Sequence, residues 1–116
     1  MYNGEPGKVT NAIVAEKVMG WKYVPEEREG IISSQGEGWT DGATFYKAGE
    51  WSPSTNLVDA FQVVNKMLDD GFIYRIEGKT LGGEHYASFD NVGAYHSELE
   101  HAICLAALAA VETVES

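Results

Sequence analysis

The chain has 116 residues, of which 18 are acidic and 8 are basic, so its formal charge is −10. This length is typical of one domain, and apolar residues make up 44% of the chain, which predicts a single folded domain over residues 1–116 and argues against disorder. The charge repels phosphate backbones and anionic bilayers, so we expect neither broad nucleic-acid binding nor membrane binding. An acidic surface can also mimic DNA when it binds a basic partner, and the sequence leaves this alternative open.

No apolar run reaches the roughly 18 residues that a membrane-crossing helix needs. The first residues, Met1 to Pro6, lack the basic start and apolar stretch of a signal peptide, and we therefore expect a cytoplasmic protein. The single cysteine, Cys104, excludes an intramolecular disulfide. Its alanine- and leucine-rich surroundings favour a buried apolar role over a reactive thiol.

The first predicted element is a helix over residues 10–19. Thr10 or Asn11 can provide the N-terminal cap, and Gly20 is a typical stop. Alternation of aromatic and polar residues over 21–23 then predicts a short extended stretch.

Residues 25–49 are rich in charge and glycine and are typical of loops. Two brief apolar pieces, residues 31–32 and 43–46, could form edge strands or a hairpin within this segment. Because loops tolerate change and carry binding groups, we expect the recognition surface here.

The clearest helix is predicted over residues 55–70. Side chains of 54–56 offer capping oxygens and Gly71 closes the end. Its apolar residues follow helical spacing and form an amphipathic stripe, namely Leu57, Phe61, Val64 and Leu68, widened by Ala60 and Met67.

Two segments with strand character follow, residues 72–77 and 85–90, and a glycine-containing loop separates them. This order predicts an antiparallel hairpin. Residues 93–96 are interpreted as a flexible connection. A final helix is predicted over 98–114, and because it is apolar on several sides it should be mostly buried or should contact a partner subunit.

Four stretches of the sequence are distinctive when taken in order. They are Ile13-Val14-Ala15-Glu16-Lys17-Val18-Met19-Gly20-Trp21, then Trp51-Ser52-Pro53-Ser54-Thr55-Asn56, then Ala60-Phe61-Gln62-Val63-Val64 with Lys66-Met67, and finally Ala102-Ile103-Cys104-Leu105-Ala106-Ala107-Leu108. Through these stretches the chain resembles the phage ABA-sandwich domain family. The resemblance implies an α+β fold, with a small, mostly antiparallel β-sheet sandwiched between helices in α/β/α layers, and an origin in a phage or prophage. It carries over no catalytic residues, and residues 25–50 have no clear counterpart in the family.

The sequence contains no pattern typical of a catalytic or metal site. His96 and His101 are five positions apart, whereas two ligands on one helix face are three or four apart, so we expect these residues and His85 to be ordinary surface or hairpin histidines. No Gly-x-Ser-x-Gly motif occurs, and the acidic residues of 25–50 have no calcium-loop spacing. We therefore expect a protein that is not an enzyme and has neither a metal nor a cofactor.

The candidate binding residues are aromatic or basic. Core packing is the expected role of Trp21 and Trp51, whereas Trp39, with its glycine-rich surroundings, is predicted to be exposed in the loop and to anchor a partner together with Tyr46. The two arginines, Arg28 and Arg75, are the candidates for a phosphate-bearing ligand.

These observations favour a phage or prophage accessory protein that acts by binding in the bacterial host cytoplasm. The hypothesis is a counter-defence inhibitor that captures a host defence protein or a signalling nucleotide, and the negative charge favours the protein. The alternative is a structural or assembly protein that forms a homo-oligomer through its C-terminal helix.

Overall fold

The structure, a computed structural model, describes residues 6–28, 30–32, 36–78 and 83–115. Within these residues it contains three helices, α1 (Lys8–Lys17), α2 (Leu57–Asp69) and α3 (Leu99–Glu115). The strands pair antiparallel in separate sheets. These are β1 (Lys22–Val24), β4 (Gly38–Thr40) and β5 (Phe45–Lys47), then β2 (Glu27–Arg28) with β3 (Ile31–Ile32), and finally β6 (Tyr74–Glu77), β7 (His85–Phe89) and β8 (Val92–His96).

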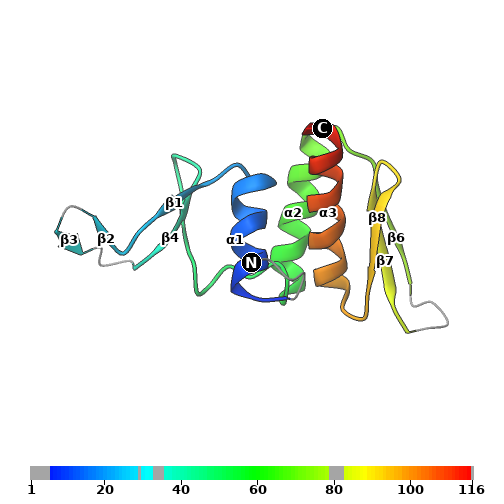
Figure 1. Ribbon diagram of the computed structural model, residues 1–116, viewed down its shortest axis with the longest axis horizontal. Helices are drawn as coiled ribbons and strands as arrows, with labels where there is room; N and C mark the ends of the chain where they lie inside the picture. Colours follow the sequence, from blue (N-terminus) through cyan, green and yellow to red (C-terminus); the bar gives the residue numbers. More distant parts are fainter. Residues whose placement is uncertain (1–5, 29, 33–35, 79–82, 116) are drawn as a thin grey trace.

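The helices form the middle of an elongated molecule, 52 Å long (Figure 1). The β6–β7–β8 sheet lies on one side of them and the β1–β4–β5 sheet on the other. Helix α3 is central, because it packs against β7 and β8 and also contacts α2 and α1. The predicted α+β sandwich fold is confirmed, but the order of the layers differs from the expectation: the helices form the central layer and a small antiparallel sheet lies on each side, instead of one sheet between helices.

The core lies mainly between α3 and the β6–β7–β8 sheet. Phe89 and Ala87 point from β7 toward the helix and are fully buried. Small side chains on α3 allow this close approach, and the buried ones are Ala102, Ala106, Ala107 and Ala110. The expected burial of the last helix is thus achieved within one chain.

Helix α1 begins earlier than the sequence predicts. Its N-cap is Gly7, and Thr10 and Asn11, which were predicted as caps, lie inside the helix and are buried. Asn11 is placed there by tertiary hydrogen bonds, which local sequence cannot reveal. The predicted stop at Gly20 agrees with its backbone, whose φ of 72° suits glycine.

Asn11 joins α1 to the segment that precedes α2. Its Oδ1 accepts from the backbone N–H of Ser54 at 3.1 Å and from the Ser54 hydroxyl at 2.7 Å. Its Nδ2 donates to the Ser52 hydroxyl at 2.9 Å. The serines of the Trp51–Asn56 segment therefore hold two helices together.

The same segment fixes the start of α2. Asn56 is the N-cap, and its side chain accepts from the Asp59 N–H, as predicted for the residues before this helix. The Asp59 carboxylate accepts in turn from the Ser52 N–H at 2.9 Å, and the Trp51 indole N–H donates to Gln62 at 3.0 Å. The residues that carry the family resemblance here form a structural joint.

The expected flexible connection at 93–96 is instead strand β8, and that prediction was wrong. Phe89 pairs with Val92, so only Asp90 and Asn91 form the turn, and both have positive φ, 52° and 70°. Two residues with positive φ are the signature of a tight hairpin turn, and Asp and Asn tolerate this conformation. The Asp-Asn pair was a signal available in the sequence.

The segment 25–49 is more regular than the predicted loop. Residues 31–32 form a strand, as predicted, and the apolar piece at 43–46 contributes Phe45 and Tyr46 to β5. Strand β4, which contains Trp39, was not predicted. It forms because both of its edges pair, one with β1 and one with β5.

The apolar stripe predicted for α2 faces the core only along one side. Val64 and the two residues that widen the stripe, Ala60 and Met67, are buried together with Val63. The other three stripe residues are exposed at 40%, 39% and 47%, for Leu57, Phe61 and Leu68 respectively. The helix therefore presents a large apolar surface to solvent.

The Cys104 thiol is buried in α3, and burial, followed by the nearby Glu100 carboxylate, raises its pKa well above the usual range. The thiolate is the form that attacks a disulfide reagent, and here it is both scarce and inaccessible. We expect no reaction with a disulfide reagent such as dithionitrobenzoate in native conditions, and release of one equivalent of product after unfolding in guanidinium chloride. Rapid native labelling would contradict the buried position.

Candidate functional site

The structure places the predicted site residues Trp39 and Tyr46 side by side but not in an exposed loop. They are cross-strand partners on β4 and β5. Trp39 is only 6% exposed and meets the Tyr23 ring edge-on at 5.2 Å, so its predicted exposure was wrong. Pairing of β4 on both edges turns its side chain against α1, where it lines a small cavity with Asn11 and Ala12.

Tyr46 belongs to an aromatic cluster that attaches the β1–β4–β5 sheet to the rest of the molecule. Its ring stacks on the Trp21 ring with 4.0 Å between the ring centroids, and the Trp21 and Trp51 ring centroids are 4.7 Å apart. Trp21 and Trp51 are buried, as the sequence predicted. Such stacking stabilises the fold, and it leaves Tyr46 half-buried rather than free to anchor a partner.

The arginines lie in different sheets. Arg28 is in β2, and its side chain is outside the described part of the structure. Arg75 is in β6, exposed, with its Nε 4.0 Å from the Glu77 carboxylate. Trp39 and Tyr46 lie in the sheet at the opposite end of the molecule, so the four predicted residues do not form one site.

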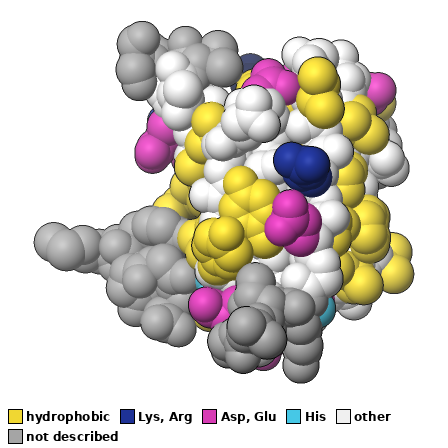
Figure 2. All heavy atoms as spheres, turned by 90° about the vertical axis from the view of Figure 1, so that its right-hand side faces the viewer, with side chains coloured by type: hydrophobic (Ala, Val, Ile, Leu, Met, Phe, Trp, Pro, Cys, Tyr) yellow, Lys and Arg dark blue, Asp and Glu magenta, His cyan; other side chains and the backbone are white. Residues whose placement is uncertain are grey.

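Arg75 alternates along β6 with residues whose partners, Phe89 and Ala87, are buried, so it lies on the outer face of the β6–β7–β8 sheet. Figure 2 shows this face, where hydrophobic side chains gather beside basic and acidic ones. Tyr86 and Tyr95 are paired across β7 and β8 with ring centroids 4.7 Å apart. Tyr86 also covers Gly93, where any Cβ would collide with its ring. The outer face is thus a shallow aromatic surface, with a groove of about 420 Å³ beside Arg75, Ser88 and Asp90.

One tyrosine at this groove has an unusual environment. The Tyr74 hydroxyl is buried and has no hydrogen-bond partner within the described residues. Burial raises the pKa of Tyr74 to about 12, so this side chain stays neutral and does not supply a charge to a ligand.

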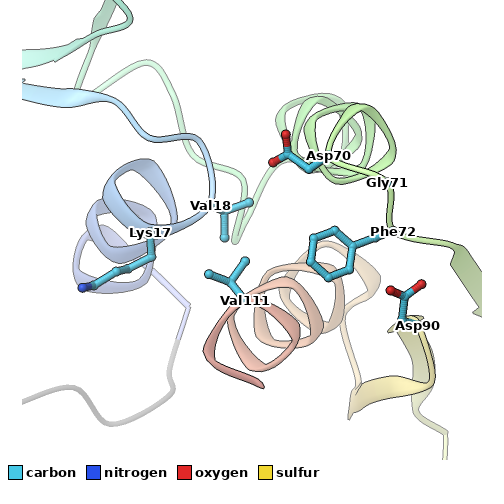
Figure 3. Close-up of a pocket in the computed structure, with 7 residues that line it drawn as sticks. All are labelled: Lys17, Val18, Asp70, Gly71, Phe72, Asp90 and Val111. Carbon is cyan, nitrogen blue, oxygen red and sulfur yellow. The ribbon is translucent and has the colours of Figure 1, made fainter. Parts of the chain in front are cut away.

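A larger cavity, of about 520 Å³, opens where the C-terminal ends of the helices meet (Figure 3). Val18 after α1, Phe72 after α2 and Val111 of α3 point toward one another and form its apolar floor. Asp70 and Asp90 stand on two sides of the Phe72 ring, and Lys17 also lines the cavity but directs its amine away from it. The cavity therefore combines an apolar floor with a negatively charged rim.

Helix direction strengthens the negative potential at this cavity. All three helices run the same way, with their C-terminal ends together at the top of Figure 1. Each such end carries about half a negative charge from the aligned peptide dipoles. The cavity lies where these ends converge, so its field favours a cation.

The two carboxylates of the rim are held in place by their own contacts. Asp70 accepts from the Lys66 ammonium at 2.7 and 2.8 Å. Asp90 accepts from the Ile73 backbone N–H at 2.7 Å and donates its own N–H to the Ile73 carbonyl. Each carboxylate has two oxygens with several acceptor positions, so both can bind a further donor.

The three histidines come closer together than the sequence predicted. His85 and His96 are cross-strand partners, and the His96 ring meets the His101 ring edge-on at 4.5 Å. His101 is fully buried rather than at the surface, so that prediction was wrong. Even so, no three acidic, cysteine or histidine side chains in the described residues are arranged to hold a metal ion.

The sequence matches one known protein family over most of its length. The model of the phage ABA sandwich domain matches residues 12–108, which include every helix and both three-stranded sheets apart from the ends of α1 and α3. The chain belongs to the phage ABA sandwich domain family. The resemblance seen in the sequence is therefore confirmed, and the match includes the Trp51–Asn56 joint. No curated protein matches the chain.

A solved structure shows the same fold. The crystal structure of a phage protein from Bacillus cereus ATCC 14579 is similar to this chain with a TM-score of 0.60 and 20% sequence identity, over 94% of this chain and 95% of that one. At this identity the similarity concerns the fold alone. None of the described helices is long and apolar enough to cross a membrane.

Proposed function

We propose that this member of the phage ABA sandwich family is a non-enzymatic accessory protein that works by binding in the host cytoplasm. In this proposal it is a counter-defence inhibitor, and its target is a host protein. The observation that carries the proposal is the cavity at the helix C-terminal ends, with its apolar floor and its two carboxylates (Figure 3).

The chemistry of the cavity fits a basic side chain of the partner. Lysine and arginine combine an apolar stem with a charged head. The stem would lie on Val18, Phe72 and Val111, and the head would reach Asp70 or Asp90. The overall charge of −10 would speed the approach of a basic surface.

A signalling nucleotide is a weaker candidate for the same cavity. Its phosphates would meet two carboxylates and three negative helix ends. Arg75, the cation predicted to bind phosphate, lies on the outer sheet face, where Asp90 lines the same groove. The charges therefore support the protein partner.

The alternative of assembly through the final helix has less support. Most described side chains of α3 are buried against β7, β8, α1 and α2 of the same chain. A second helix would have little apolar surface of α3 left to contact.

The proposal predicts that the rim carboxylates are needed for binding. The double variant Asp70→Asn/Asp90→Asn keeps the side-chain shapes, and asparagine tolerates the positive φ at position 90. We expect at least about tenfold weaker retention of the host protein that the wild type captures, because the charge-assisted hydrogen bond to the basic head group is lost whichever carboxylate accepts it. Quantitative mass spectrometry after affinity capture from host lysate measures this loss. The control Glu26→Gln/Glu50→Gln removes the same charge from exposed sites near the other sheet and should behave as wild type.

A small-molecule probe separates the cavity from the identity of the partner. n-Butylguanidinium should shift the methyl NMR signals of Val18 and Val111, whereas neutral n-butylurea should not. Equal shifts with both probes would contradict a cation site. So would n-butylguanidinium shifts in the Asp70→Asn/Asp90→Asn variant that are as large as in the wild type. Micromolar binding of cyclic nucleotides in calorimetry, with no captured host protein, would contradict the choice of a protein partner.

A further inference from the structure

Strand β6 forms an open edge of its sheet, because among the described residues it pairs with β7 on one side and with no strand on the other. The turn after β7 shows which backbone groups face this open side. Phe89 and Val92 flank a two-residue turn, so the backbone groups of Phe89 point toward β8. The next residue, Asp90, points the opposite way and donates its N–H to the Ile73 carbonyl.

Hydrogen bonding alternates along an antiparallel pair, and this alternation fixes the direction of every backbone group of β6. Residues 73, 75 and 77 face β7, whereas the N–H and C=O groups of Tyr74 and Ile76 point to the open edge. Proteins commonly protect such an edge with a proline or a β-bulge. Strand β6 has no proline, and its register with β7 is regular, so the edge is available to a further strand.

The inner face of β6 is also incompletely covered. Ile76 is the cross-strand partner of the buried Ala87 and therefore lies on the helix side of the sheet. It is nevertheless 36% exposed, because α3 packs mainly against β7 and β8. A strand added at this edge would cover Ile76 if it brought an apolar side chain to the same position.

The outer face of β6 carries one charge of each sign, on Arg75 and Glu77. Both side chains are largely exposed, and the Arg75 Nε is 4.0 Å from the Glu77 carboxylate, a weak surface contact. In two antiparallel copies of β6, a register centred on either residue would oppose like charges, and one centred on Tyr74 would leave both charges without a partner. A register centred on Ile76 places Arg75 of each copy directly opposite Glu77 of the other.

We propose that two copies of the protein associate through antiparallel pairing of their β6 strands about a two-fold axis at Ile76. Ile76 would exchange backbone hydrogen bonds with its own copy, and Tyr74 with Gly78 of the second copy, about six bonds in all. The two Ile76 side chains would meet on the inner face and the two Arg75–Glu77 pairs on the outer face. The result is one continuous sheet with three strands from each copy.

The charges favour a second copy over an unrelated extended peptide. A peptide satisfies the backbone groups of the edge whatever its sequence, whereas the chain itself always brings an arginine and a glutamate in the matching register. Only a short strand pairs, so the Kd is on the order of micromolar or weaker. None of residues 74–78 lines the cavity at the helix ends, so the dimer does not depend on the function of that cavity.

Exchange of the two charges tests the register. By sedimentation equilibrium the wild type should approach the mass of a dimer at several hundred micromolar. Arg75→Glu alone and Glu77→Arg alone should stay monomeric, because each opposes like charges, but their equimolar mixture should form dimers, because both pairs are restored. Lys22→Glu, an equal charge change at an exposed residue of the other sheet, should behave as wild type. A monomeric wild type, or single variants that dimerise as tightly as the wild type, would overturn the proposal.

Cross-linking tests the position of the two-fold axis. Ile76→Cys, oxidised with diamide, should form disulfide dimers, because its two copies would lie about 5.5 Å apart between Cα atoms, within reach of a disulfide. Ile73→Cys should cross-link far more slowly, although Ile73 is 75% exposed, because its two copies would be about 20 Å apart along the strands. The buried Cys104 should not contribute. Equal cross-linking of the two variants would contradict the pairing at Ile76.

Discussion

The variant Phe89→Ala is expected to lower the free energy of unfolding by about 3–5 kcal/mol, the usual range for removal of a buried phenylalanine ring. Phe89 is fully buried between β7 and α3, and its ring lies 5.2 Å from the Tyr74 ring. Around it α3 is fixed by contacts with α1, α2, β7 and β8, so the helix cannot move inward to fill the space. The loss therefore includes a cavity as well as buried apolar area.

Unfolding in guanidinium chloride, followed by circular dichroism, measures this change. Tyr95→Ala is the matched control, because it removes an aromatic ring from the exposed outer face of the same sheet. Its effect should stay near 1 kcal/mol, the scale of one aromatic cross-strand pair. Similar losses in the two variants would show that the core is not where the structure places it.

Asn11→Ala is expected to destabilise the protein by about 2–4 kcal/mol. The change removes three hydrogen bonds to Ser52 and Ser54, and it leaves the buried Ser54 N–H without its acceptor. The better helix propensity of alanine offsets only about 0.6 kcal/mol. Because Asn11 joins α1 to the start of α2, we also expect faster exchange of the backbone amide hydrogens in α1 and at the start of α2.

A double-mutant cycle tests whether the loss of stability comes from the contact between Asn11 and Ser54. Asn11→Ala and Ser54→Ala should be strongly non-additive, because each removes the other's partner. Asn65→Ala, an exposed residue of α2, should change the free energy of unfolding by less than about 0.5 kcal/mol. Additive effects of Asn11→Ala and Ser54→Ala would argue against the joint.

The joint has a consequence for the search for function. The Trp51–Asn56 segment is one of the most recognisable parts of the family resemblance, and its polar side chains are occupied by structural hydrogen bonds. The residues that identify the family therefore stabilise its fold. The cavity, by contrast, is formed where the helices end.

Local patterns in the sequence predicted all three helices and two strands of the β6–β7–β8 sheet to within about two residues. Helical spacing, Asn56 as a capping residue and Gly71 as a stop are short-range signals, and the structure uses them as predicted. Strand β8 was missed because its alternation of small and aromatic residues is weak. The Asp90–Asn91 turn was the stronger signal.

The candidate site was not predictable in the same way. Its lining residues lie at positions 17–18, 70–72, 90 and 111, which are far apart in the sequence. No motif connects them, and each by itself is an ordinary residue near the end of a helix or in a turn. The predicted site residues Trp39 and Tyr46 were chosen for their chemistry, but their burial depends on strand pairing that no local pattern revealed.

The sequence by itself determined the composition, the charge, the family and the succession of helices, because these depend on residue types and on neighbours within about one or two helical turns. Only the tertiary structure decided which apolar residues are covered. Helix α2 shows the reason: spacing made Leu57, Phe61 and Leu68 a stripe, but α3 packs against Ala60, Val63 and Met67, where smaller or more flexible side chains allow closer approach. Tertiary packing thus left Leu57, Phe61 and Leu68 exposed and brought three helix ends together around an acidic cavity in a small acidic domain.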